Sequence, residues 1–229
     1  MFIILHGSPS DHSRALAQVE PSFEGRHGWR RVYPDLPGHG RTPGSSKIRD
    51  MDDYLRTMLA FVDEVSAGKR FCIGGISFGA YLALGIVRKR RRRIAGLLLS
   101  VPEIYHSPTE DRLDEQHGTP SIQTPREVAP TLPGYVEDTA WLEGLPFRDV
   151  SIDLYRGHPP VRAPALLLFG RRDAPFRAER YWRVLRDFPE ATFAVLGGAG
   201  HRLWTDRNEV ACALTRDWLD RVAASGSRG

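Results

Sequence analysis

Residues 71–84 read FCIGGISFGAYLAL, and this stretch decides the fold. An apolar run of strand length meets a Gly-x-Ser-x-Gly turn at Gly75, Ser77 and Gly79, and a helix-favouring apolar run follows directly. Such a turn is so tight that the residues two before and two after the serine must be nearly without side chain, and both are glycine. The pattern therefore predicts a strand, a sharp turn that holds Ser77 at the strand's carboxyl end, and a helix.

The rest of the chain predicts further strands and helices in alternation. Apolar runs of strand length lie at 2–5, 94–101, 165–169 and 192–196, and residues 29–33 are predicted to form a further strand. Helical patterns lie at about 13–23, 51–65, 177–187 and 207–222; Asp50 or Asp52 favours the start of the second, and the last has an apolar face of Val210, Ala213, Leu214 and Trp218. Residues 225–229 are expected to fray. Alternation with short loops predicts an α/β fold, with a mostly parallel sheet and helices on both faces.

The regular alternation stops between Pro102 and about Pro164. This segment holds nine of the 17 prolines before Pro164 and scattered aromatic residues, Tyr105 among them, but no long periodic face. A structureless loop of this length is unusual inside a compact domain, so we expect a cap with short helices and a partly apolar pocket. The expected division is a core of residues 1–101 and 165–229 and a cap inserted at 102–164, with no second independent domain.

The composition is that of an ordinary globular protein. The 229 residues are 41% hydrophobic and 26% charged, and no apolar run approaches the roughly 20 residues that cross a bilayer. Residues 1–5 lack a basic leader and end at His6, which favours a strand over a signal peptide. Cys72 and Cys212 lie in apolar patterns that indicate burial and not a disulfide framework. We therefore expect a soluble, cytoplasmic protein that does not bind membranes.

Positive charge is concentrated in one run, Arg88 to Arg93. The net charge is +4, but without these six residues 26 basic residues would face 28 acidic ones, a net of −2. The run lies where the helix after Ser77 should end, and cations there favour the helix carboxyl end and water. A solvated helix end is the expected explanation, with an acidic partner as the alternative. No aromatic residues interleave the run, so we expect no nucleic-acid binding.

Two further residues complete a candidate catalytic group around Ser77. A serine hydroxyl needs a neighbouring base, and the base needs a group that fixes its tautomer. Asp173 follows the strand at 165–169, and His201 follows a glycine-rich turn after the strand at 192–196. Each alone is most simply explained as a loop or turn residue. Because the order Ser77, Asp173, His201 is that of nucleophile-elbow hydrolases, together they predict a triad at one sheet edge.

The chain resembles the α/β-hydrolase superfamily in five motifs spread over nearly its whole length. They are His6-Gly7-Ser8-Pro9, Asp35-Leu36-Pro37-Gly38-His39-Gly40, Gly75-Ile76-Ser77-Phe78-Gly79, Gly170-Arg171-Arg172-Asp173 and Gly200-His201. The resemblance implies that Ser77 is the nucleophile, His201 the general base and Asp173 the orienting acid. It also implies an oxyanion hole made of the backbone N–H groups of Ser8 and Phe78.

Two departures from the family pattern affect the expected sheet and the expected substrate. The family usually has an antiparallel pair of strands before the His-Gly strand, which here begins at Met1. The expected sheet therefore has about six parallel strands with 29–33 as an exposed edge, unless the native chain begins upstream of Met1. Residues 77–82 also resemble the proline iminopeptidase branch. That branch has His-Gly-Gly-Pro-Gly where this chain has His6-Gly7-Ser8-Pro9-Ser10, which argues against an aminopeptidase.

Other candidate residues have competing explanations. Glu103 is the alternative triad acid, because some relatives of this fold carry the acid after the strand that follows the elbow. His6 and His39 are expected to brace loops, with substrate contact as the alternative. Trp204 either lines the acyl pocket or packs in the core, and Tyr105 is a second candidate for contact with the substrate.

These features predict a cofactor-free serine hydrolase that acts on a small or medium ester, lactone or thioester. Carbon–carbon bond hydrolysis, a lyase step or amide hydrolysis on the same triad is the nearest alternative, because function belongs to the site and not the scaffold. A non-catalytic ligand receptor is the remaining one. No metal site is expected, because three histidines of the cap have no metal-ligand spacing: His106, His117 and His158. The expected partner is a small acyl substrate, and the oligomeric state stays open.

Overall fold

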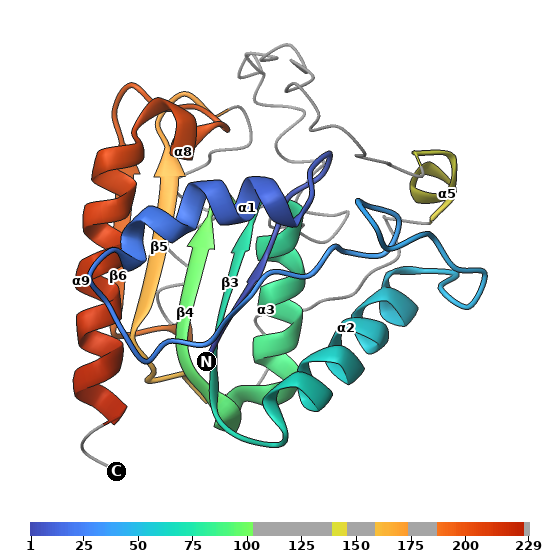
Figure 1. Ribbon diagram of the computed structural model, residues 1–229, viewed down its shortest axis with the longest axis horizontal. Coiled ribbons are helices and arrows are strands. Elements are labelled where there is room, and N and C mark those ends of the chain that lie inside the picture. The colour runs from blue at the N-terminus through green and yellow to red at the C-terminus, as the bar shows by residue number, and fades with distance from the viewer. Residues whose placement is uncertain (103–138, 146–158, 174–186, 227–229) are drawn as a thin grey trace.

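Six parallel strands form one sheet in the order β2-β1-β3-β4-β5-β6 (Figure 1). The computed structural model describes residues 1–102, 139–145, 159–173 and 187–226. The strands are β1 (Phe2–Leu5), β2 (Arg31–Val32), β3 (Phe71–Ile76), β4 (Ile94–Ser100), β5 (Ala165–Gly170) and β6 (Ala191–Leu196). The predicted sheet of about six parallel strands is confirmed. Strand β2 lies at its edge as expected, but it is shorter than the predicted 29–33.

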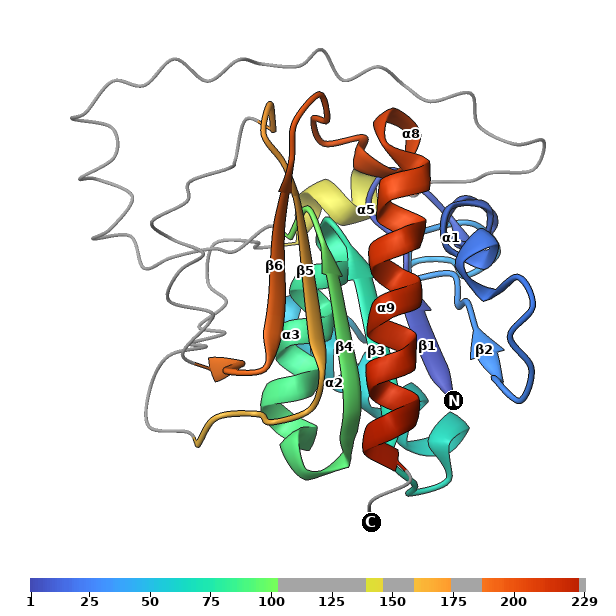
Figure 2. The same ribbon diagram turned by 90° about the vertical axis from the view of Figure 1, so that its left-hand side faces the viewer.

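Helices cover both faces of the sheet (Figure 2). On one face lie α1 (His12–Val19) and α9 (Asn208–Gly226), and on the other α2 (Met51–Ser66) and α3 (Phe78–Arg90). In β1, Ile3 and Leu5 join the core beneath α2 and α3, whereas Phe2 and Ile4 join the core beneath α1 and α9. Because side chains alternate along a strand, burial on both faces explains the continuous apolar runs of the sequence.

Two helices begin at aspartate caps. The side chain of Asp50 accepts a hydrogen bond from the N–H of Asp53 at 2.8 Å, so α2 begins at Met51, as the sequence predicts. Asp11 caps α1 in the same way, accepting from the N–H of Ser13 at 3.0 Å. Helix α1 ends at Val19, and a 3₁₀ turn follows over Glu20–Phe23. The helix predicted at 13–23 is therefore two elements.

The last helix corrects two predictions. A short helix, α8 (Leu203–Asp206), precedes α9, and α9 continues to Gly226, so residues 225 and 226 are helical and not frayed. The buried residues of α9 include Ala211, Thr215, Trp218 and Val222, whereas Ala213 of the predicted face is exposed. The Trp218 ring lies 5.1 Å from that of Phe2, and its N–H donates to the carbonyl of Pro164 at 3.0 Å. Both contacts fix the rotation of the helix.

Part of the predicted cap packs on the core. Helix α5 (Thr139–Gly144) carries Trp141, whose N–H donates to the carbonyl of Ser45 at 3.2 Å and whose ring lies 6.2 Å from that of Tyr54. Leu142 is buried in the core beneath α2 and α3. Residues 103–138 and 146–158 of the predicted cap, and all but the last residue of the predicted helix 177–187, lie outside the described residues. The division into core and cap stays a prediction.

Both cysteines are buried thiols, as predicted. Burial raises the pKa of the Cys72 thiol to about 12, so it stays protonated and packs as a small apolar side chain. Within the described ranges, no helix is both long and apolar enough to cross a membrane.

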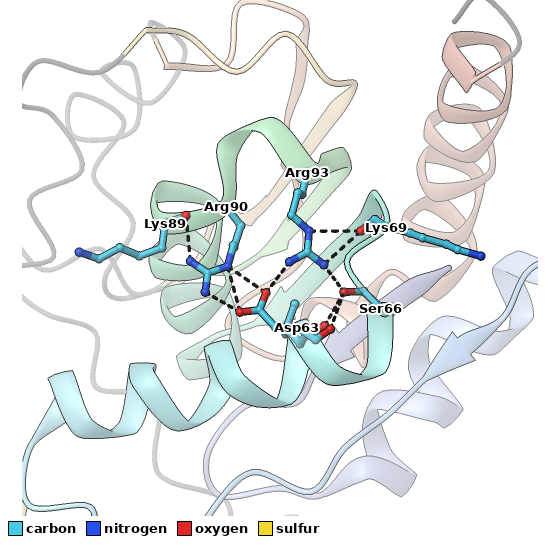
Figure 3. A network of polar contacts seen from close by, with 7 residues as sticks. Asp63, Ser66, Lys69, Lys89, Arg90 and Arg93 are labelled. Atoms are coloured by element: carbon cyan, nitrogen blue, oxygen red, sulfur yellow. Dashed lines mark hydrogen bonds and ion pairs between the residues drawn. The ribbon is translucent and has the colours of Figure 1, made fainter.

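The arginine run at the end of α3 is held by Asp63 of α2 (Figure 3). Nε of Arg90 donates to this carboxylate at 2.9 Å, and Arg93 contacts the same group. Arg93 also donates to the hydroxyl of Ser66 and to the carbonyl of Lys69. Hydrogen bonds from Arg90, with a smaller effect from Arg93, hold the pKa of Asp63 below its usual range. The expectation of a merely solvated helix end is thus wrong for these two residues, which tie α3 to α2.

Candidate active site

Ser77 lies in a strained turn between β3 and α3. Its φ is +52° and its ψ is −118°, a region that residues other than glycine rarely adopt. The N–H of Ser77 donates to the carbonyl of Ser100 at 2.9 Å, which anchors the turn to the end of β4. The sharp strand-turn-helix predicted from the sequence is therefore present, with Ser77 at the carboxyl edge of the sheet.

Both glycines of this elbow are required by close backbone contacts. A Cβ on Gly75 would lie 2.2 Å from the carbonyl oxygen of Gly79, and a Cβ on Gly79 would lie 2.3 Å from that of Leu5. Neither clash can be relieved by a side-chain rotation, because the neighbours are backbone atoms. A Cβ on Gly7 would lie 3.2 Å from the Cβ of Ser77. The loop after β1 therefore packs directly against the elbow.

A chain of hydrogen bonds joins Ser77, His201 and Asp173. Nε2 of His201 lies 2.8 Å from Oγ of Ser77, and Nδ1 lies 3.0 and 3.1 Å from the two carboxylate oxygens of Asp173. A carboxylate only accepts, so Nδ1 carries a proton. In the neutral form of the ring, Nε2 then has the lone pair that can accept from the serine hydroxyl. The side chain of Asp173 is 7% exposed and that of His201 35%. The carboxylate is shielded from water, whereas the imidazole is partly exposed to water.

The turns after β5 and β6 bring the acidic and imidazole side chains together. The N–H of Asp173 donates to the carbonyl of Gly170 at 3.1 Å, which closes the first turn. The N–H of Arg172 donates to the carbonyl of Ala199 at 2.9 Å, which ties the two turns to each other. A Cβ on Gly170 would lie 2.2 Å from the carbonyl oxygen of Gly200, so this close approach requires a glycine.

Two buried histidines hold the loop that carries Ser8. Nε2 of His6 accepts from the N–H of Leu36 at 2.9 Å, and its Nδ1 donates to the carbonyl of the following residue at 2.7 Å. Burial lowers the pKa of His6 to about 4, so the ring is neutral near pH 7. Nδ1 of His39 donates to the carbonyl of Pro37, and its Nε2 lies 3.1 Å from Oγ of Ser8. These are the bracing contacts that the sequence predicts for both histidines.

Trp204 lies beneath the site and not in an open pocket. It is 2% exposed, belongs to the core beneath α1 and α9, and donates from its indole N–H to Oγ of Ser100 at 3.0 Å. Since the carbonyl of Ser100 anchors Ser77, the indole braces the end of β4 against the elbow. Of the two explanations for Trp204, this position favours packing. Ser100 was not predicted from the sequence, in which its signal is a serine at the end of a buried apolar strand.

Five candidates lie outside the described residues: Glu103, Tyr105, His106, His117 and His158. Glu103 as the alternative acid and Tyr105 as a substrate contact therefore stay predictions. In the part of the chain that the structure describes, no three or more His, Cys, Asp or Glu side chains are grouped to hold a metal ion.

Two solved structures share nearly the whole fold. An alpha/beta superfamily hydrolase from Oenococcus oeni superposes with a TM-score of 0.76 at 19% identity, over 97% of this chain and 92% of that one. A thermophilic esterase from Thermogutta terrifontis superposes with a TM-score of 0.68 at 24% identity, over 96% of this chain and 89% of that one. At these identities the likeness establishes the fold and not the substrate.

A third solved structure, a monoacylglycerol lipase from Paleococcus ferrophilus, also shares the fold, with a TM-score of 0.65 at 19% identity, over 97% of this chain and 94% of that one.

A family model covers nearly the whole sequence. Comparison with curated protein sequences found no match. The model of the alpha/beta hydrolase family matches residues 2–214, which include the elbow and the turns after β5 and β6. The chain belongs to the alpha/beta hydrolase family.

Proposed function

We propose that this protein is a serine hydrolase that cleaves a small or medium ester, lactone or thioester through an acyl-enzyme on Ser77. The observation that carries the proposal is the unbroken chain of hydrogen bonds from Oγ of Ser77 through His201 to Asp173. Membership of a hydrolase family supports the reaction class, as do an esterase and a lipase among the structures of the same fold.

In the proposed mechanism His201 acts first as base and then as acid. Its Nε2 takes the hydroxyl proton of Ser77 while Oγ attacks the substrate carbonyl carbon. Asp173 accepts from Nδ1–H, which holds the ring in the required tautomer and stabilises the imidazolium. His201 then gives the proton to the leaving alcohol or thiol. A water deprotonated by Nε2 attacks the acyl group, and release of the acid restores the hydroxyl of Ser77.

The backbone N–H groups of Ser8 and Phe78 are the proposed oxyanion hole. Phe78 is the first residue of α3, where the helix dipole favours negative charge. The contact of Gly7 with the elbow supports the placement of the Ser8 loop beside Ser77. One such donor contributes about 10²- to 10³-fold in turnover.

Substrate selection is assigned to the cap at 102–164, set on a core of 1–101 and 165–229. The packing of Trp141 supports the position of this cap on the core, since a Cβ on Gly38 would lie 2.7 Å from its ring. The two buried thiols are compatible with the cytoplasmic location expected from the sequence, which is part of the proposal.

Covalent labelling tests the mechanism. A fluorophosphonate probe followed by mass spectrometry is expected to modify Ser77, and hydrolysis of p-nitrophenyl acetate is expected to be lost in Ser77→Ala. The matched control is Ser46→Ala, at an exposed serine, which should keep both labelling and hydrolysis. An unlabelled Ser77 in folded protein would contradict the acyl-enzyme.

The same assays separate the alternatives. Labelling of Ser77 without hydrolysis of p-nitrophenyl esters would favour carbon–carbon bond hydrolysis, a lyase step or amide hydrolysis, and p-nitroanilides test the last of these. Ligand binding without turnover on any of these substrates would favour a receptor.

A further inference from the structure

A basic cavity lies at the amino edge of the sheet, opposite the edge that carries Ser77. Its volume is about 380 Å³, and it lies where β4 and β5 begin and α9 ends. Four arginines line it: Arg70, Arg91, Arg92 and Arg162. Strands of six residues rise about 3.3 Å per residue, so the cavity lies roughly 20 Å from Ser77. It is therefore not part of the proposed active site.

Among the residues that the structure describes, no acidic side chain neutralises the charges of this cavity. Among the described residues, none of the four arginines forms an ion pair, and no aspartate or glutamate lines the cavity. Asp63, which neutralises part of the same arginine run, is already bound by Arg90 and Arg93 (Figure 3). Four like charges around one hollow repel each other, and an anion placed among them removes that repulsion.

Two of the guanidinium groups are oriented by the backbone. A terminal nitrogen of Arg91 donates to the carbonyl of Pro159, and one of Arg70 donates to the carbonyl of Ile94 at 3.1 Å. The Nε of Arg91 is buried and has no hydrogen-bond partner within the described part of the chain. A buried donor on a charged group is costly to leave unpaired, so Arg91 lacks part of the hydrogen bonding that a guanidinium usually has.

We propose that this cavity binds a phosphorylated small molecule, with the phosphate oxygens among the four guanidinium groups. A guanidinium presents a planar fork of donors that matches the spacing of phosphate oxygens. Ile94, Val161 and the neighbouring prolines offer an apolar wall for the rest of the ligand. The volume lies within the roughly 300–1,000 Å³ of small-molecule sites. Because the cavity lies at the amino ends of β4 and β5 and the carboxyl end of α9, at the opposite edge from Ser77, its ligand is not the substrate of the proposed hydrolase.

Calorimetric titrations of the full chain at fixed ionic strength test this site. Inorganic pyrophosphate is expected to bind with a submillimolar Kd, and acetate is not expected to bind. Phenyl phosphate should bind more tightly than inorganic phosphate, because its ring contacts the apolar wall. Arg91→Gln and Arg92→Gln should each weaken pyrophosphate binding at least about tenfold, the scale expected for a charged hydrogen bond. Hydrolysis of p-nitrophenyl esters should be unchanged in both, so failure of this site and failure of the hydrolase mechanism are distinguishable.

The matched control is Arg30→Gln. Arg30 is exposed and donates to the carbonyl of Val65, so its loss removes the same charge and the same type of contact away from the cavity. Pyrophosphate binding should stay at the wild-type value. If Arg91→Gln does not fold by circular dichroism, Arg92→Gln decides, because Arg92 is exposed and its loss does not affect the core.

Two results would overturn the proposal. The first is pyrophosphate binding that is no tighter than acetate binding, or equally tight in Arg92→Gln and wild type. The second is tighter binding, lost in Arg92→Gln, to a single-stranded oligonucleotide or to phosphatidylcholine vesicles containing phosphatidic acid. That result would assign the arginines to a nucleic acid or a lipid surface and not to a small molecule.

Discussion

The two edges of the sheet use polar side chains in opposite ways. At the carboxyl edge a hydroxyl, an imidazole and a carboxylate from three turns pair one to one, through Ser77, His201 and Asp173. At the amino edge one carboxylate, Asp63, binds two arginines, and four more arginines line a cavity to which the described part of the chain contributes no acidic residue. The first edge is complete without a ligand, whereas the charges of the second are balanced when an anion binds.

The difference follows from what positions the side chains. At the carboxyl edge the backbone does so, through the strained φ of Ser77 and the contact of Gly79 with the carbonyl of Leu5. At the amino edge, long and mostly exposed side chains carry the charge, and a guanidinium on a long chain supplies a field more than a fixed position. The carboxyl edge is therefore suited to chemistry and the amino edge to binding.

The largest expected effect is at the carboxyl edge, in Ser77→Gly. Loss of the nucleophile should lower kcat for p-nitrophenyl acetate by about 10⁴-fold or more. Glycine also tolerates a positive φ, so Ser77→Gly should be about 1 kcal/mol more stable in urea unfolding than Ser77→Ala, which keeps the strain. Equal stability of the two variants would show that the turn stores no strain, and the contrast between the edges would lose its physical basis.

The second effect tests the acid at the same edge. In Asp173→Asn, the amide nitrogen can donate to Nδ1 of His201, which favours the tautomer with its proton on Nε2. That tautomer cannot accept the proton of Ser77, so kcat should fall by about 10³- to 10⁴-fold with KM little changed. Stopped-flow hydrolysis of p-nitrophenyl acetate measures both. A decrease below tenfold would reassign the role of acid, and Glu103→Gln would then be the variant to compare.

The parts of the molecule that depend on local backbone geometry could be predicted from the sequence. Gly75, Ser77 and Gly79 specify the elbow because each contact involves neighbouring turns of backbone. Asp50 caps α2 three residues from its partner, which is a sequence-local contact. Apolar runs buried on both faces identified β1, β3, β4 and β5.

Contacts between distant segments could not be read in this way. Asp63 and Arg90 are 27 residues apart, so the pairing that orders the arginine run depends on how α2 packs against α3. The rotation of α9 is set by the fit of Trp218 against Phe2, and periodicity alone placed Ala213 on the wrong face. Strand β2 is short because only Arg31 and Val32 pair with β1.

The third effect is a loss of stability on acidification that comes from His6, at the carboxyl edge. Burial, with a smaller contribution from repulsion by His39, lowers the pKa of His6 from 6.5 to about 4. It outweighs the hydrogen bond to the carbonyl of Gly7 and the attraction of two acidic residues, which raise the pKa. The folded state therefore holds His6 neutral. The contribution of His6 to the free energy of unfolding is full above pH 6.5 and is lost as pH falls through about 4. The loss amounts to about 3 kcal/mol. Urea unfolding between pH 4 and 7 measures it. His6→Gln should remove this dependence, whereas His27→Gln, at an exposed position, should keep it.

The smallest expected effect is at the amino edge, in Asp63→Asn. Removing a partly exposed carboxylate that binds two arginines should lower the free energy of unfolding, measured in urea, by about 1 kcal/mol. This decrease should become smaller as the salt concentration is raised. The pKa of Asp63 is lowered in the folded protein, so its contribution is present at neutral pH and lost on acidification.

Asp217→Asn is the matched control for this variant, because Asp217 makes one exposed pair with Arg221. It should cost less than about 0.5 kcal/mol. Neither variant should change kcat/KM for p-nitrophenyl acetate, since neither side chain reaches the carboxyl edge. A change in kcat/KM for Asp63→Asn alone would mean that α2 and α3 transmit the state of the arginine run to the first turn of α3. The two edges would then be coupled, and an anion in the basic cavity would be expected to regulate Ser77.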